Sequence, residues 1–217
     1  MDPYAMLEEI FESEAALAGF LGTFLVIMLV LLVVLWAYAI TAYVLHSLGL
    51  YKIAKRRGIH NPWLAWLPVG QAWILGSISD HYQYIARGKT RNYRKVLMWL
   101  EIGLYGLSII MSIISFATSF STAMGAAMES EAMMMTSVMG LAGVSIIMSL
   151  FVIAASITYS VFAYICYYDL FRSCSPKNAV LYLVLSIVVS ITMPFFIFAC
   201  RNSDEGMPPK IRNTVDA

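Results

Sequence analysis

Glu101 is the residue best placed for chemistry, because it is the one charged side chain well inside a long apolar stretch, residues 96–119. A carboxylate at membrane depth is costly, and such residues commonly mark ion or proton pathways. The functional interpretation is a proton or cation site that faces other helices. The structural interpretation is a carboxylate near the membrane interface that pairs with Arg94 or Lys95.

Three ionisable side chains, His60, Asp80 and His81, flank a short apolar segment, residues 61–79. If that segment folds as a hairpin, its two ends meet and His60 approaches Asp80 and His81. The three side chains could then bind a metal or form an acid/base pair. No HExxH or comparable spacing supports a metal site. The alternative is that these residues cap helix ends at the level of the lipid headgroups.

Within the same segment, Gln71, Trp66 and Trp73 join Glu101 as our candidates for binding a substrate or an ion. The stretch 120–136 is rich in methionine, whose thioethers suit Cu(I). A flexible apolar loop explains this stretch equally well. The three cysteines show no CxxC spacing and predict no disulfide framework. Packed or interfacial thiols are the favoured interpretation, and a metal site is the weaker one. We expect no cofactor.

The composition indicates a membrane protein. The chain of 217 residues is 60% hydrophobic and 12% charged, whereas soluble domains are about 25% charged. No segment outside the apolar stretches is long enough to fold alone, which argues against a soluble catalytic domain. The lipid bilayer is therefore the expected partner, and nothing favours a nucleic acid.

Charge is sorted along the chain. Residues 1–14 carry acids and no base, whereas residues 52–95 carry nine bases and one acid. The positive-inside rule places the N-terminus outside and the basic loop 52–95 in the cytoplasm. An acidic start and a long apolar run argue against a cleavable signal peptide. Some bases could also bind anionic lipid headgroups: Lys55, Arg56, Arg57, Arg91, Arg94 and Lys95.

These patterns predict an all-α integral membrane protein with three long transmembrane helices and two proline-broken hydrophobic segments. The predicted order is an acidic N-terminus (1–14), spans at 18–47, 96–119 and 137–167, a re-entrant or interfacial segment at 61–79, a methionine-rich outer loop (120–136), a second broken segment (179–200) and a polar tail (201–217).

The second broken segment has two interpretations, a hairpin or a fourth span. A weak internal repeat favours the hairpin, because Tyr51 precedes Asn61 by the same interval as Tyr168 precedes Asn178. Internal repeats are common in membrane proteins that build a central site. The polar, proline-containing tail is predicted to be disordered.

The stretch from Asn61 to Pro68, NPWLAWLP, followed by Gln71 and Leu75, resembles an element of small uncharacterised polytopic membrane proteins of Gram-positive bacteria. In that element an Asn stands where this chain has Gln71. The resemblance implies a protein of the bacterial cytoplasmic membrane and implies no catalytic residues.

The leading hypothesis is a membrane-embedded binding or transport protein, or an accessory subunit of a transport assembly, with a cavity lined by Glu101, Gln71 and the tryptophans. The second hypothesis is a structural or regulatory subunit that acts through lipid contacts, a membrane-protein partner or a second copy of itself. An intramembrane metal-dependent enzyme is the third.

Overall fold

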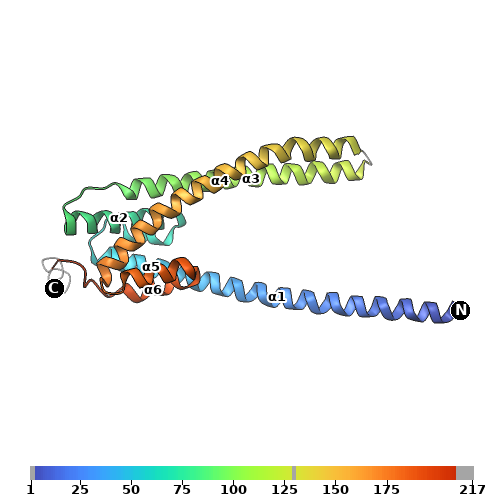
Figure 1. Cartoon of the computed structure of the whole chain (residues 1–217), viewed down its shortest axis with the longest axis horizontal. Coiled ribbons are helices and arrows are strands. Elements are labelled where there is room, and N and C mark those ends of the chain that lie inside the picture. Colours follow the sequence, from blue (N-terminus) through green and yellow to red (C-terminus); the bar gives the residue numbers. More distant parts are fainter. Residues whose placement is uncertain (1–2, 129–130, 209–217) are drawn as a thin grey trace. The chain divides into compact units, whose positions relative to one another are not determined.

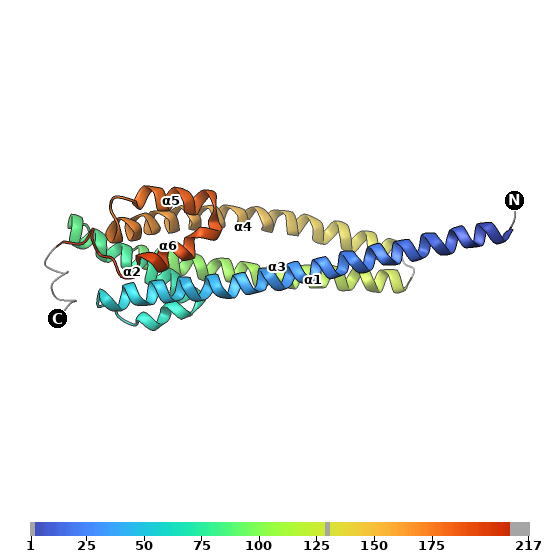
Figure 2. The ribbon, with the colours of Figure 1, turned by 90° about the horizontal axis from the view of Figure 1, so that it is seen from below.

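The computed structural model describes residues 3–128 and 131–208, with side chains over residues 19–128 and 143–208. Every regular element in these residues is helical (Figures 1 and 2). The long helices are α1 (Pro3–Arg56), α3 (Tyr93–Ala127) and α4 (Glu131–Cys174), and the shorter elements are η1 (Pro62–Trp66), α2 (Pro68–Arg87), α5 (Ala179–Val188), η2 (Ser190–Thr192) and α6 (Met193–Cys200).

Three stretches are long and apolar enough to cross a membrane: Gly19–Arg56, Tyr93–Ala127 and Gly143–Cys174. The predicted fold class is therefore confirmed. The chain divides into two compact units, residues 1–44 and 45–217, which we describe separately.

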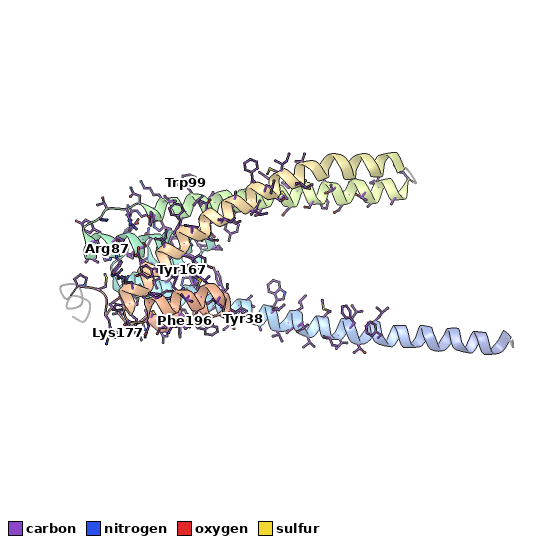
Figure 3. All side chains as sticks on the ribbon, viewed as in Figure 1. Tyr38, Arg87, Trp99, Tyr167, Lys177 and Phe196 are labelled. Atoms are coloured by element: carbon purple, nitrogen blue, oxygen red, sulfur yellow. The ribbon has the colours of Figure 1, made fainter. Side chains whose placement is uncertain are left out.

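The first unit is the N-terminal part of α1. Apolar side chains project from both sides of this helix, as Figure 3 shows around Tyr38, and those from Phe20 to Trp36 are exposed. A helix that is apolar all round needs a nonpolar surrounding. Lipid provides it.

The second unit is organised around α2. Ile74, Leu75 and Ile78 are buried, and α2 packs against both α3 and α4. The last turns of α1 also belong to this core, where Leu50 and Ile53 are buried. The apolar segment near residue 61 thus leads into the central helix of the unit.

A tight turn separates α1 from η1. Gly58 adopts a left-handed conformation (φ 64°), and the Ile59 amide donates to the Ala54 carbonyl at 3.0 Å. This is the hydrogen-bonding pattern of a glycine-terminated helix, and it explains why α1 stops within the basic cluster.

The two prolines of the first broken segment start helices. Pro62 lies at the beginning of η1 and Pro68 at the beginning of α2, where a missing amide proton costs nothing. Gly70 lets the two elements meet, since a Cβ there would lie 2.1 Å from the Leu64 carbonyl oxygen. The segment is therefore a hairpin of η1 and α2.

The second broken segment is also a hairpin. Each arm is short, with 10 residues in α5 and 8 in α6, or about 15 and 12 Å. Tyr182 of α5 stacks on Phe196 of α6, with ring centroids 4.8 Å apart. Both ends of the hairpin lie beside the end of α4, because residues after α6 bond to Ser173 and Cys174.

The prediction of a disordered tail is wrong for residues 201–208. The Ser203 hydroxyl donates to the Cys174 carbonyl at 2.6 Å, and the Gly206 amide donates to the Ser173 carbonyl at 3.1 Å. Composition suggested disorder because the segment is polar. The carbonyls at the end of α4 need donors, however, and this segment supplies them.

The helices extend beyond the predicted transmembrane spans. Helix α1 continues through Arg56, α3 through Ala127, and α4 runs from Glu131 to Cys174, so most of the predicted loop at 120–136 is helical. Apolarity marks what can lie in lipid, whereas helical hydrogen bonding continues into polar sequence. The side chains of Met133, Met134, Met135 and Met139 lie outside the described residues, as do those of residues 1–14.

Candidate functional site

A pocket of about 630 Å³ lies between the first hairpin and the loop before α3. The turn before η1 contributes His60 and Asn61, and α2 contributes Trp73, His81 and Tyr84, among others. The loop and the start of α3 contribute Thr90, Arg91, Asn92 and Arg94. We call this the basic pocket.

The three ionisable residues grouped from the sequence, His60, Asp80 and His81, all line this pocket. Burial lowers the pKa of His81, and the nearby Arg57 guanidinium lowers it further, so this imidazole is neutral at pH 7. In the described part of the chain, no group of three or more His, Cys, Asp or Glu side chains could hold a metal ion.

Asp80 caps α3. Its two carboxylate oxygens accept hydrogen bonds from the amides of Tyr93 (3.0 Å) and Arg94 (3.2 Å). These are the first amides of α3, which have no partner within their own helix. Burial raises the pKa of Asp80, and the two amide bonds oppose that shift. The carboxylate therefore positions the start of α3.

One turn before Asp80, Gly76 permits this arrangement. A Cβ at Gly76 would lie 2.4 Å from the Cα of Arg94 and 2.6 Å from its amide nitrogen. Gly76 and Asp80 lie four residues apart on α2 and so face the same side. Together they place the start of α3, and hence Arg94, at the pocket.

In the described residues no ion pair forms to the two arginines of the pocket, although both act on Asp80 at longer range and lower its pKa. The ion pairs found in the described residues all involve Asp204, with Arg56 or Arg57. Arg94 lies over the Trp73 ring at 5.4 Å, and Arg91 lies over Tyr93 at 5.0 Å. Such contacts orient a guanidinium and leave its donors available.

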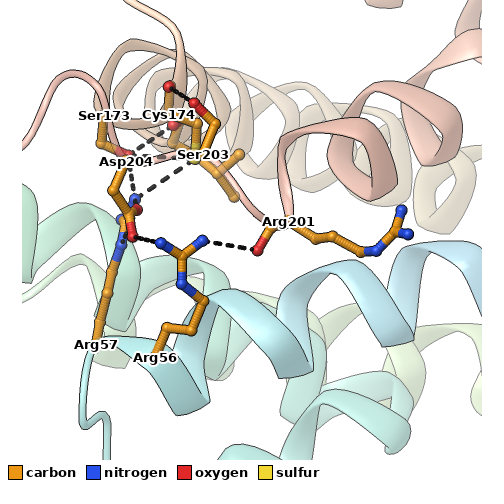
Figure 4. A network of polar contacts seen from close by, with 8 residues as sticks. Arg56, Arg57, Ser173, Cys174, Arg201, Ser203 and Asp204 are labelled. Carbon is orange, nitrogen blue, oxygen red and sulfur yellow. Dashed lines mark hydrogen bonds and ion pairs between the residues drawn. The ribbon is translucent and has the colours of Figure 1, made fainter. Parts of the chain in front are cut away.

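Arg56 and Arg57 form ion pairs that the sequence did not predict. Both contact the Asp204 carboxylate, at 2.7 and 2.8 Å (Figure 4). Arg57 also donates to the Ser173 hydroxyl at 2.8 Å, and its side chain is only 1% exposed. Arg57 is therefore a buried link between α1, the end of α4 and the segment after α6, and is not available to lipid headgroups.

The remaining basic candidates lie at the surface. Lys55 is exposed and lies over the Tyr51 ring at 5.9 Å, and Lys95 is exposed at the start of α3. Neither lines the basic pocket.

The predicted substrate residues do not share one pocket. Trp73 lines the basic pocket, whereas Glu101 lines a smaller pocket of about 300 Å³ between α3 and α4. Gln71 lines neither pocket and donates to the Ser47 hydroxyl at 3.0 Å. Trp66 also lines neither, and it is 40% exposed.

A third, more open groove of about 660 Å³ runs along the far halves of α3 and α4. It has no charged side chain. The hydroxyls of Thr118, Ser119 and Thr122 in this groove each donate to a carbonyl of their own helix. We see no ligand chemistry in it.

Sequence reasoning missed Asp169. This carboxylate is 3% exposed and accepts hydrogen bonds from Ser79 and Gln83, both at 2.7 Å. The contact joins α2 to α4 inside the core. The sequence feature that could have indicated this contact is the four-residue spacing of Ser79 and Gln83, which places both side chains on one face of α2.

Comparisons of the chain with protein-family models, with curated proteins and with solved structures gave no match.

Proposed function

We propose that this multi-pass membrane protein binds a phosphate-bearing anion, and specifically the headgroup of an anionic phospholipid, in the basic pocket. The observation that carries the proposal is the pair Arg91 and Arg94, which line the pocket without an ion-pair partner in the described residues. The guanidinium fork suits phosphate oxygens.

The rest of the lining fits an amphiphilic ligand. Trp73 and Tyr84 add aromatic surface, and such rings favour the level of the headgroups. Asn61, Thr90 and Asn92 can donate hydrogen bonds to phosphate or glycerol oxygens. The one carboxylate in the lining, Asp80, accepts hydrogen bonds from the α3 amides and offsets part of the charge of the two arginines, which leaves the lining with a net positive charge.

The test is a binding titration of the full chain, purified in a neutral detergent, with short-chain phosphatidylglycerol, phosphatidylcholine and inorganic phosphate. R91Q/R94Q is expected to lower the affinity for phosphatidylglycerol about tenfold or more, at about 1 kcal/mol per base. The matched control is R87Q/K89Q, which removes two charges from the end of α2 and the adjacent loop, outside the pocket lining.

An equal loss in both variants would show that general surface charge, rather than this pocket, binds the anion. Phosphatidylcholine binding as strong as phosphatidylglycerol binding would also contradict the proposal. Tight binding of inorganic phosphate, without binding of phosphatidylglycerol, would indicate that the ligand is a soluble phosphate and not a lipid.

The distribution of charge along the chain sets the side of the membrane on which we place the basic pocket. The basic loop 52–95 lies in the cytoplasm, and the η1–α2 hairpin enters the membrane from that side. The segment after α6 lies on the same side, because Asp204 contacts Arg56 and Arg57.

Single cysteines at two positions test this topology. The described cysteines, Cys166, Cys174 and Cys200, are buried, so background labelling should be low. Tyr84→Cys and Glu205→Cys should react with a membrane-impermeant maleimide in inside-out vesicles and not in intact cells. Labelling of either position in intact cells would contradict the proposed topology.

A further inference from the structure

The pocket around Glu101 is a second site, separate from the basic pocket. It lies between α3 and α4, in the stretches of those helices that are apolar enough to cross a membrane. The two pockets share no lining residue.

Glu101 itself is incompletely satisfied. The Tyr159 hydroxyl of α4 lies close enough to interact with its carboxylate. One carboxylate oxygen, Oε2, is buried and has no hydrogen-bond partner in the described part of the chain. A carboxylate oxygen that is withdrawn from water needs a compensating donor or cation.

The neighbouring hydroxyls are oriented to accept and not to donate. Ser108 gives its proton to the Tyr105 carbonyl at 2.8 Å, and Ser156 gives its proton to the Val152 carbonyl at 2.7 Å. Each serine oxygen therefore keeps lone pairs free for another partner. Such oxygens supply no donor to Glu101, but they can join it as ligands.

The charge of the pocket lining indicates the charge of the group that would pair with Glu101. The lining holds one carboxylate and no basic side chain. Its polar groups are all oxygens, from Glu101, Tyr159, Tyr105, Ser108 and Ser156, and oxygen ligands suit hard cations. A divalent ion would leave one charge uncompensated at membrane depth, whereas a monovalent ion balances Glu101.

We infer that the Glu101 pocket is a binding site for a monovalent hard cation of the Na⁺ type. The carboxylate supplies the charge, and the hydroxyls of Ser108 and Ser156 supply neutral oxygen ligands from the two facing helices.

The experiment measures thermal unfolding of the full chain in detergent, in NaCl against choline chloride at equal ionic strength. Ligand that binds the folded state raises the midpoint, so Na⁺ should raise it in the wild type and not in E101Q. S108A/S156A should weaken the apparent Na⁺ affinity about tenfold, the loss of two neutral contacts. The matched control S112A/S160A removes hydroxyls of the same kind outside the pocket lining and should leave the Na⁺ response unchanged.

An Na⁺ response that persists in E101Q would overturn the inference. So would a midpoint in the wild type that rises on acidification and is insensitive to Na⁺, because a proton would then be the partner of Glu101. If E101Q does not fold, the test is the binding of ²²Na⁺ to S108A/S156A. An affinity equal to that of the control variant S112A/S160A would refute the site. R91Q/R94Q should keep the full Na⁺ response, so this test is independent of the basic pocket.

Discussion

Replacing Gly76 by alanine should destabilise the protein by about 3 kcal/mol, the upper part of the range for overpacked sites. The added methyl group would lie 2.4 Å from a backbone atom of Arg94. Backbone cannot rotate out of the way as a side chain can, so α2 and α3 must separate. Separation also breaks the bonds from the Tyr93 and Arg94 amides to Asp80, which adds the loss of a helix cap, about 1 kcal/mol.

Thermal unfolding with a thiol-reactive dye would measure this effect, because Cys166, Cys174 and Cys200 are buried until the protein unfolds. A fall in the midpoint of roughly 10 °C is expected, from about 2–4 °C per kcal/mol at this size. The matched control is Gly103→Ala on α3, where nothing lies within 4 Å of the new Cβ. Equal unfolding midpoints for the two variants would show that α2 and α3 can move apart at little cost in stability.

Asp204→Asn should cost about 3 kcal/mol, because it removes the anionic partner of a buried guanidinium. Arg57 keeps its bond to Ser173 but loses its counter-charge, and Arg56 loses its ion pair as well. The segment after α6 should then detach from the end of α4.

Glu205→Gln is the control for this variant, since it removes the same charge from the adjacent, exposed position. It should change stability by no more than about 0.5 kcal/mol. Hydrogen exchange would locate the effect, with faster exchange of the Glu205 and Gly206 amides in Asp204→Asn. Unchanged exchange at these amides would mean that the backbone bonds to α4 hold the segment without the ion pairs.

The sequence sufficed for the parts of this fold that lipid dictates. Long uncharged runs predicted the three long helices, and the prolines and tryptophans of residues 61–79 predicted a re-entrant or interfacial segment. The condition that a hairpin there would bring its ends together led to the grouping of His60 with His81, and both line the basic pocket. Hydropathy and the distribution of charge are local properties of the sequence. The long helices and the broken segment depend on these local properties, so they could be predicted.

The sequence was insufficient for contacts between residues far apart in the chain. Nothing local indicates that Asp204 pairs with Arg57, or that Asp169 accepts bonds from Ser79 and Gln83. Counting bases along residues 52–95 treated all of them as equivalent, whereas packing buries Arg57 and leaves Arg91 and Arg94 at a pocket. The separation of Glu101 from Gln71 has the same origin, because Glu101 faces α4 whereas Gln71 bonds to Ser47 of α1.

The contact between Arg57 and Asp204 also sets the order of events during synthesis. The two residues are 147 positions apart, and a ribosome adds roughly 5–20 residues per second, so Arg57 waits about 7–30 s for its partner. During that interval the guanidinium must remain hydrated or be shielded by lipid phosphate. Packing of α2 against α3 needs no such delay. The core around α2 can therefore assemble first, and the ion pairs to Asp204 complete the fold afterwards.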